Sequence, residues 1–148
     1  MKSIIFLAMM STSAFALNCP FTEQNTDYTK TLAVCEDSRT SAVVCLAEYT
    51  NSGNYKIQVE DSSLDGQYNI GFSGKQIRSS NAKKIVLKDK QFGLGIIGYR
   101  NIQFELDRVK ATAKFKFKTT GCGFSIVNDS PDPTCLPNKS YKFDRCIF

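Results

Sequence analysis

Residues 102–118 read IQFELDRVKATAKFKFK, and this stretch decides the fold class. Apolar and polar residues alternate strictly in IQFELD, and phenylalanine alternates with lysine in KFKFK. A period of two is typical of a β-strand with one buried face. The two segments therefore predict an antiparallel hairpin with all of its large apolar side chains on one face. The side chains on that face are Phe104, Leu106, Phe115 and Phe117.

The register that we expect for this hairpin pairs opposite charges on its polar face. Glu105 then faces Lys116, and Asp107 faces Lys114. Exposed cross-strand pairs of this kind contribute only about 0.2–1 kcal/mol each. They would still neutralise part of the positive charge of these two lysines.

Strand-sized segments also fill the rest of the middle of the chain. The runs SAVVCLAEYT, NYKIQVED, GQYNIGF and KKIVLKD are rich in β-forming residues, and clusters of Asn, Ser, Asp and Gly separate them. The stretch near residues 27–36 could form one short helix, and the proline-containing tail 128–139 is expected to be an irregular loop. Several short strands predict an all-β fold, a single antiparallel sandwich or barrel. The sequence does not separate these two architectures.

The first sixteen residues, MKSIIFLAMMSTSAFA, have the features of a secretory signal peptide. A lysine is followed by a short apolar run and by a small-x-small cleavage site at 14–16. We expect cleavage before Leu17, which leaves residues 17–148 as one disulfide-rich domain. We therefore expect an exported protein, periplasmic or extracellular.

A lipid-modified Cys19 is the alternative to simple cleavage. Lipid-bearing cysteines follow a small residue, whereas Asn18 precedes this one and Pro20 follows it. After residue 16, no apolar run approaches the roughly 20 residues that a membrane-spanning helix needs. We expect neither a lipid anchor nor a transmembrane segment.

The chain has six cysteines, all of them after the predicted cleavage site. They are Cys19, Cys35, Cys45, Cys122, Cys135 and Cys146. An even number in an exported chain predicts three disulfides, which here would staple both ends of the domain. There are 15 possible connectivities, and Cys135–Cys146 is the best single guess. Because the chain has no histidine and no CxxC pair, we expect no metal site.

Residues 93–98 read GLGIIG, which matches the GxGxxG pattern of nucleotide-binding turns. Such a turn must follow a buried parallel strand and begin a helix. Here a lysine-rich segment precedes the glycines, and the alternating strand pattern follows them. We therefore interpret these glycines as marking a bulge or bend, and expect no cofactor.

The absence of histidine excludes the Ser-His-Asp and Cys-His types of hydrolase. A pair of carboxylates could still catalyse glycoside hydrolysis. The candidate carboxylates are Glu60, Asp61 and Asp65, or Glu105 and Asp107. None of them forms a convergent acid–base set in the sequence, so we expect no enzyme. An envelope enzyme that uses such a pair remains the second alternative.

The charge distribution is the most informative feature for function. Residues 75–118 contain 12 basic and 3 acidic residues, a net charge of +9, whereas the rest of the chain after residue 16 has 6 basic and 11 acidic residues, a net charge of −5. Lys84, Lys88 and Lys90 share one face of a predicted strand. The candidate binding residues are Lys83, Lys84, Lys88, Lys90, Arg100 and Lys118.

These observations favour a non-catalytic binding protein whose basic surface takes an anionic ligand. The candidate partners are an anionic polysaccharide, a lipid head group or an acidic protein. Nucleic acid is not favoured, because few aromatic residues interleave with the basic ones. The first alternative is a structural subunit of a surface layer or appendage, in which the basic middle of one copy binds the acidic flanks of the next. Alternatively, the lysines could simply lie on the solvent-exposed faces of strands and bind no partner.

Overall fold

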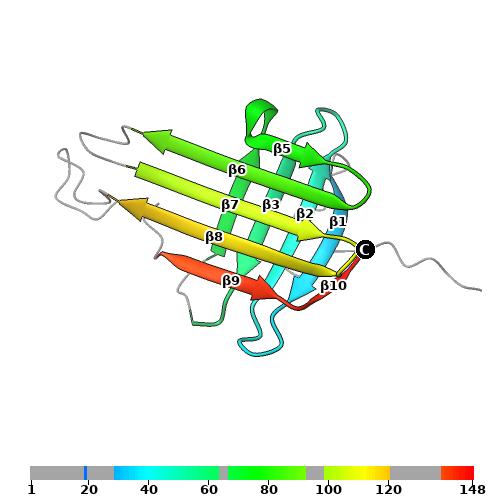
Figure 1. The fold of residues 1–148 in the computed structure, drawn as a ribbon, viewed down its shortest axis with the longest axis vertical. Helices are drawn as coiled ribbons and strands as arrows, with labels where there is room; N and C mark the ends of the chain where they lie inside the picture. Colours follow the sequence, from blue (N-terminus) through cyan, green and yellow to red (C-terminus); the bar gives the residue numbers. More distant parts are fainter. Residues whose placement is uncertain (1–18, 20–28, 64–66, 93–98, 121–137) are drawn as a thin grey trace, which may run out of the picture.

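The computed structural model describes Cys19 and residues 29–63, 67–92, 99–120 and 138–148. These residues form ten strands and one short 3₁₀ turn. The strands make two antiparallel sheets of five strands each, with the two sheets packed face to face (Figure 1). The predicted all-β antiparallel fold is confirmed, and the architecture is a sandwich.

The first sheet has the strand order β10-β1-β2-β3-β4. Its strands are β1 (Thr29–Glu36), β2 (Val43–Tyr49), β3 (Tyr55–Glu60), β4 (Gln67–Phe72) and β10 (Arg145–Ile147). The turn η1 (Gly74–Gln76) leads into the second sheet, which has the order β5-β6-β7-β8-β9. Its strands are β5 (Ile77–Ser80), β6 (Lys84–Phe92), β7 (Tyr99–Asp107), β8 (Thr112–Thr120) and β9 (Lys139–Phe143). The strands of the two sheets cross steeply in Figure 1, as in orthogonal sheet packing.

The core lies between the sheets and is rich in aromatic rings. Phe115 is completely buried, with its ring centroid 5.3 Å from that of Tyr68 and 6.1 Å from that of Tyr141. The predicted apolar face of the hairpin is confirmed. Its buried members are Phe104, Leu106, Phe115 and Phe117.

The hairpin is antiparallel as predicted, but the predicted register was wrong. Glu105 faces Lys114 and not Lys116, which faces Gln103 instead. The Oδ1 atom of Asp107 accepts hydrogen bonds from the backbone N–H groups of the second and third residues after it, at 3.0 and 2.9 Å. Ala111 has the left-handed φ of 51°. Together these features close the turn in four residues, 108–111, whereas the predicted register required six.

The short helix expected near residues 27–36 is also wrong, because residues 29–36 form strand β1. This strand lies between β2 and β10. Ala33 and Cys35 are buried in the main core, while Val34 packs on the other side of the sheet with Cys19 and Cys45. Strand β1 is hydrogen-bonded to a neighbour on each edge and has buried side chains on both faces. These interactions outweigh the weak helical pattern of residues 27–36.

Two disulfides join the described cysteines, Cys19–Cys45 and Cys35–Cys146. The predicted Cys135–Cys146 bridge was therefore wrong. Cys146 lies directly opposite Cys35 in the pairing of β10 with β1, so the bridge is set by strand pairing and not by closeness in sequence. Because the Cys19 sulfur is bonded to Cys45, it cannot carry a thioether-linked lipid. Cys122 and Cys135 lie outside the described residues.

Three other sequence features lie outside the described residues. They are the predicted signal peptide (1–16), the GLGIIG segment (93–98) and nearly all of the proline-containing tail (128–137). In the part of the chain that the structure describes, no helix has the length and apolar character to cross a membrane.

Candidate functional site

The outer face of the second sheet carries most of its lysines, in a regular arrangement. On β6, Lys88 pairs with Gln103 of β7, which in turn pairs with Lys116 of β8. One row further along, the same three strands present Lys90, Asn101 and Lys118. We call Lys88, Lys90, Lys116 and Lys118 the lysine quartet. Each row thus has a neutral amide side chain between two cations.

The spacing of the quartet follows from sheet geometry. Lysines two residues apart on one strand are separated by about 7 Å, and those on β6 and β8 by about 10 Å, because two interstrand spacings lie between them. Lys90, Lys116 and Lys118 are exposed, and Lys88 is partly exposed. The quartet is therefore a flat grid of four cations and not a focused pocket.

The acidic side chains of this face lie away from the quartet. Lys84 forms an ion pair with Glu105 at 2.8 Å, and this hydrogen bond raises the pKa of Lys84. Asp107 lies beyond Glu105 on β7 and accepts the turn hydrogen bonds, which lower its pKa. Among the described side chains of β6 to β9, the half of the outer face around Asn101 and Gln103 contains no carboxylate.

The structure brings together four of the six predicted binding residues. They are Lys84, Lys88, Lys90 and Lys118, which share the outer face of the second sheet. Lys83 is exposed in the turn before β6, where its carbonyl accepts a hydrogen bond from the Arg108 backbone N–H. Arg100 alternates in phase with the buried Ile102 and therefore points to the inner face. It therefore lies on the opposite face of the sheet from Lys88, Lys90 and Lys118.

Three further lysines, Lys114, Lys116 and Lys142, lie on this face. The expected register paired Lys116 with Glu105, which would partly neutralise it, but the observed register leaves Lys116 beside Gln103. Lys142 of β9 pairs with Lys114 and is exposed. A sequence signal for the correct register was present in Asp107, since aspartate at the start of a tight turn commonly accepts the backbone N–H groups that follow.

Comparison with known proteins gives no match: no protein-family model, no curated protein and no solved structure matches this chain.

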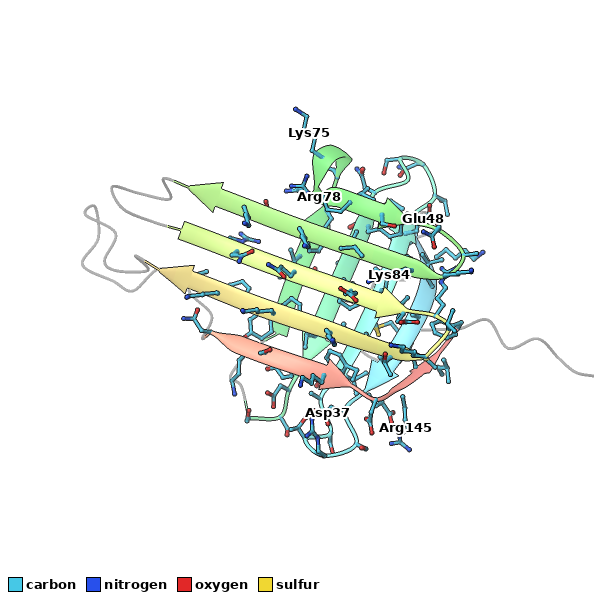
Figure 2. The ribbon with its side chains drawn as sticks, viewed as in Figure 1. Asp37, Glu48, Lys75, Arg78, Lys84 and Arg145 are labelled. Carbon is cyan, nitrogen blue, oxygen red and sulfur yellow. A yellow bond between two sulfur atoms is a disulfide. The ribbon has the colours of Figure 1, made fainter. Side chains whose placement is uncertain are left out.

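The edges of the second sheet add to its basic character. Figure 2 shows Lys75 and Arg78 at its upper edge, and Lys84 over the end of the sheet where β6 begins. Val86 is the only apolar residue on the outer face among the described side chains of β6 to β9. This surface can therefore attract anions but offers little to an apolar group.

Three of the five candidate catalytic carboxylates, Asp61, Glu105 and Asp107, have other partners in the structure. Glu105 is paired with Lys84, and Asp107 accepts the backbone hydrogen bonds of the turn that follows it. Glu60 is exposed at the end of β3, and Asp65 lies outside the described residues. In the described part of the chain, no group of three or more Cys, Asp and Glu side chains is placed so that it could hold a metal ion.

Asp61 is the one buried carboxylate among the described members of that set, and it belongs to a hydrogen-bond network between the sheets. It accepts hydrogen bonds from the Tyr141 hydroxyl at 2.7 Å and from the backbone N–H of Ser63 at 2.9 Å. Lys139 lies 4.0 Å away. These partners, the Ser63 N–H first, hold the pKa of Asp61 below its usual range. Burial raises the pKa of Tyr68 to about 12 and also raises that of Tyr141. The network ties β3 to β9 at one corner of the sandwich.

The lowered pKa of Asp61 predicts a specific dependence of stability on pH. Its contribution should be complete above the unfolded-state pKa of about 3.9, and should be lost as the pH falls through the lower folded-state pKa. Urea unfolding at pH 6 and pH 3 should therefore show a smaller acid-induced loss of stability for Asp61→Asn than for the unmodified protein. Equal losses in both proteins would contradict a role for Asp61 as a charged acceptor.

Proposed function

We propose that this chain is an exported, non-catalytic binding protein whose lysine quartet binds an acidic polysaccharide. The observation that carries the proposal is the grid of Lys88, Lys90, Lys116 and Lys118 around two neutral amides, with no carboxylate among the described side chains of that half of the face. The predicted signal peptide and the two disulfides support an oxidising compartment outside the cytoplasm.

The shape and composition of the face favour a polymer over the other anionic partners. Four cations spread over about 7 by 10 Å can contact successive charges of an extended chain, whereas a compact anion would reach only one or two of them. A membrane surface would be bound more firmly with apolar side chains that insert between lipids. Val86 alone has this character among the described side chains of the face. The amides of Asn101 and Gln103 can instead exchange hydrogen bonds with sugar hydroxyls.

The binding should be weak and sensitive to salt. The lysines are exposed or partly exposed, and contacts between exposed charges are screened once the Debye length falls to about 10 Å near 0.1 M salt. Electrostatic attraction of this kind speeds association more than it adds affinity. The affinity should therefore come from repeated contacts along the polymer.

Retention on immobilised heparin across a salt series tests the proposal. The variant replaces all four quartet lysines, Lys88, Lys90, Lys116 and Lys118, with glutamate. The matched control replaces Lys30, Arg39, Lys56 and Lys110 with glutamate, all of which lie off this face, and changes the net charge by the same amount. The quartet variant should elute at much lower salt than the control, while both keep their cooperative thermal unfolding.

Equal elution of the folded quartet variant and its control would show that net charge alone causes the retention, and would reject the site. Concentration-dependent assembly that is abolished by salt, without retention on heparin, would favour the structural-subunit alternative instead. Retention on anionic vesicles but not on heparin would favour a lipid head group.

A further inference from the structure

The large apolar side chains that are well exposed in the described part of the chain all lie at one end of the sandwich. They are Val109, Ile147 and Phe148, with exposed fractions of 74%, 62% and 53%. Val109 lies in the turn between β7 and β8, Ile147 is the last residue of β10, and Phe148 follows it. We call these three residues the apolar tip. Single exposed apolar residues are normal on a protein surface, whereas a group of them at one place marks an interaction site.

Two backbone hydrogen bonds bring the segments of this end together. The Cys146 N–H donates to the Ala111 carbonyl at 3.0 Å, which joins β10 to the turn 108–111. The Arg108 N–H donates to the Lys83 carbonyl at 2.9 Å, which joins the same turn to the turn before β6. Figure 1 shows both turns and the end marked C on one side of the sandwich. The apolar tip therefore belongs to one surface, although its residues come from two sheets.

The side chains next to the apolar tip are mostly basic. Lys83 and Lys110 are exposed, and Arg108 is partly exposed, with its Nε atom buried and without a hydrogen-bond partner. Segments 81–83 and 107–111 together contain three basic residues and one acidic residue, a net charge of +2. The acidic residue is Asp107, whose carboxylate accepts the backbone N–H groups of its own turn. This end of the molecule thus combines exposed apolar side chains with positive charge.

An anionic membrane surface fits this combination better than the other partners. Apolar side chains can enter a bilayer between the head groups, while long basic side chains keep their charges at the lipid phosphates. A polyanion would bind the cations but leave the apolar side chains in water. A symmetric contact with a second copy would place the same cations against each other, and like charges across an interface oppose binding.

We propose that this end of the sandwich docks on an anionic lipid surface. Val109 inserts among the lipid head groups, with Ile147 and Phe148 beside it, and the side chains of Lys83 and Lys110 bind lipid phosphates. Both parts are needed, because a few shallow apolar contacts or two or three cations alone give only marginal, reversible binding.

This docking surface is separate from the lysine quartet. Lys116 and Lys118 lie in the second half of β8, whereas the turn 108–111 comes before the first residue of that strand. The two surfaces therefore occupy opposite ends of the same strands. Failure of one proposal leaves the other standing, and a variant of the apolar tip should keep its retention on heparin.

The variant Val109→Trp tests the insertion directly, because the chain has no tryptophan of its own. Vesicles of equal parts phosphatidylglycerol and phosphatidylcholine, at low salt, should shift the tryptophan emission to shorter wavelength, and brominated lipids should quench it. Vesicles of phosphatidylcholine alone should have a much weaker effect. The control Ser62→Trp places the reporter in the exposed turn after β3, beside Asp61 and the start of β9, and should show neither change. Both variants replace exposed residues and should keep cooperative thermal unfolding.

The variant Lys83→Gln/Lys110→Gln measures the part of the cations. Each basic residue near an anionic membrane strengthens binding about fivefold, so vesicle binding should weaken about 25-fold. The control Lys56→Gln/Lys75→Gln removes the same charge away from the apolar tip and should weaken it much less; Figure 2 shows Lys75 at the upper edge of the second sheet.

Three results would overturn the proposal. The first is an emission of Val109→Trp that anionic vesicles leave unchanged. The second is an equal loss of vesicle binding in the two lysine pairs, which would mean that net charge alone causes it. The third is an emission shift that needs no lipid and grows with protein concentration, which would assign the apolar tip to self-association.

Discussion

Phe115→Ala should lower the free energy of unfolding by about 3–5 kcal/mol, which is the usual cost of removing a buried phenylalanine. Phe115 is completely buried and lies opposite Phe104 on β7 and Tyr141 on β9. Its ring packs edge-on against Tyr68, which belongs to the other sheet. Because the residue links the two layers of the sandwich, the surrounding side chains cannot easily fill the cavity. Urea unfolding monitored by circular dichroism measures the change.

Lys116→Ala is the matched control for this variant. Lys116 is the next residue on β8, but it is exposed on the outer face beside Gln103. Exposed substitutions of this kind usually change stability by less than about 0.5 kcal/mol. Similar losses for the two variants would mean that the inner and outer faces of β8 have been assigned wrongly.

Removal of the Cys35–Cys146 disulfide should have an effect of similar size. The bridge joins cysteines 111 positions apart, and closing a loop of about 100 residues is worth about 4.7 kcal/mol in the chain-entropy description. The double variant Cys35→Ala/Cys146→Ala avoids placing an unpaired hydroxyl in the core. Its urea midpoint should fall sharply relative to the oxidised protein.

The other bridge provides the comparison. Cys19–Cys45 spans only 26 positions, so its removal should cost about 3.5 kcal/mol on the same basis. It also fastens Cys19 onto the outer face of the first sheet, next to Val34. A larger loss from the Cys19–Cys45 variant than from the Cys35–Cys146 variant would contradict the expected dependence on loop length.

Alternation along the chain was sufficient to predict the fold class and the faces of the central hairpin. The period-two pattern is local, and burial of one face explains it fully, so Phe104 and Phe115 could be assigned to the core without coordinates. The same pattern placed Lys84, Lys88 and Lys90 together on the other face.

The pairing of strands could not be predicted in the same way, because it depends on turns and on partners distant in the sequence. A shift of two residues leaves every side chain on its own face, so alternation does not separate the expected register from the observed one. The four-residue turn after Asp107 decides between them. The expected register partly neutralised Lys116 with Glu105, whereas the observed register places Lys116 opposite the neutral Gln103 and so adds it to the candidate site.

The disulfides and strand β1 depend on contacts across almost the whole chain. Cys35 meets Cys146 because β10 returns to pair with β1, and no local feature of either segment indicates this. Pairing of β1 with β2 and β10 also overrides the helical pattern of residues 27–36. Arg100 was grouped with the lysines by charge alone, although its place in the alternation with Ile102 indicates the inner face.

The most direct test of the lysine quartet is a map of amide chemical shifts during titration with a heparin oligosaccharide at low salt. The account predicts that the perturbed amides lie on β6, β7 and β8, centred on Asn101 and Gln103, and that the shifts reverse as salt is added. Little change should appear on β1 to β4 of the other sheet. Shifts centred on the first sheet, or no shifts at low salt, would contradict the proposal that this face binds an acidic polysaccharide.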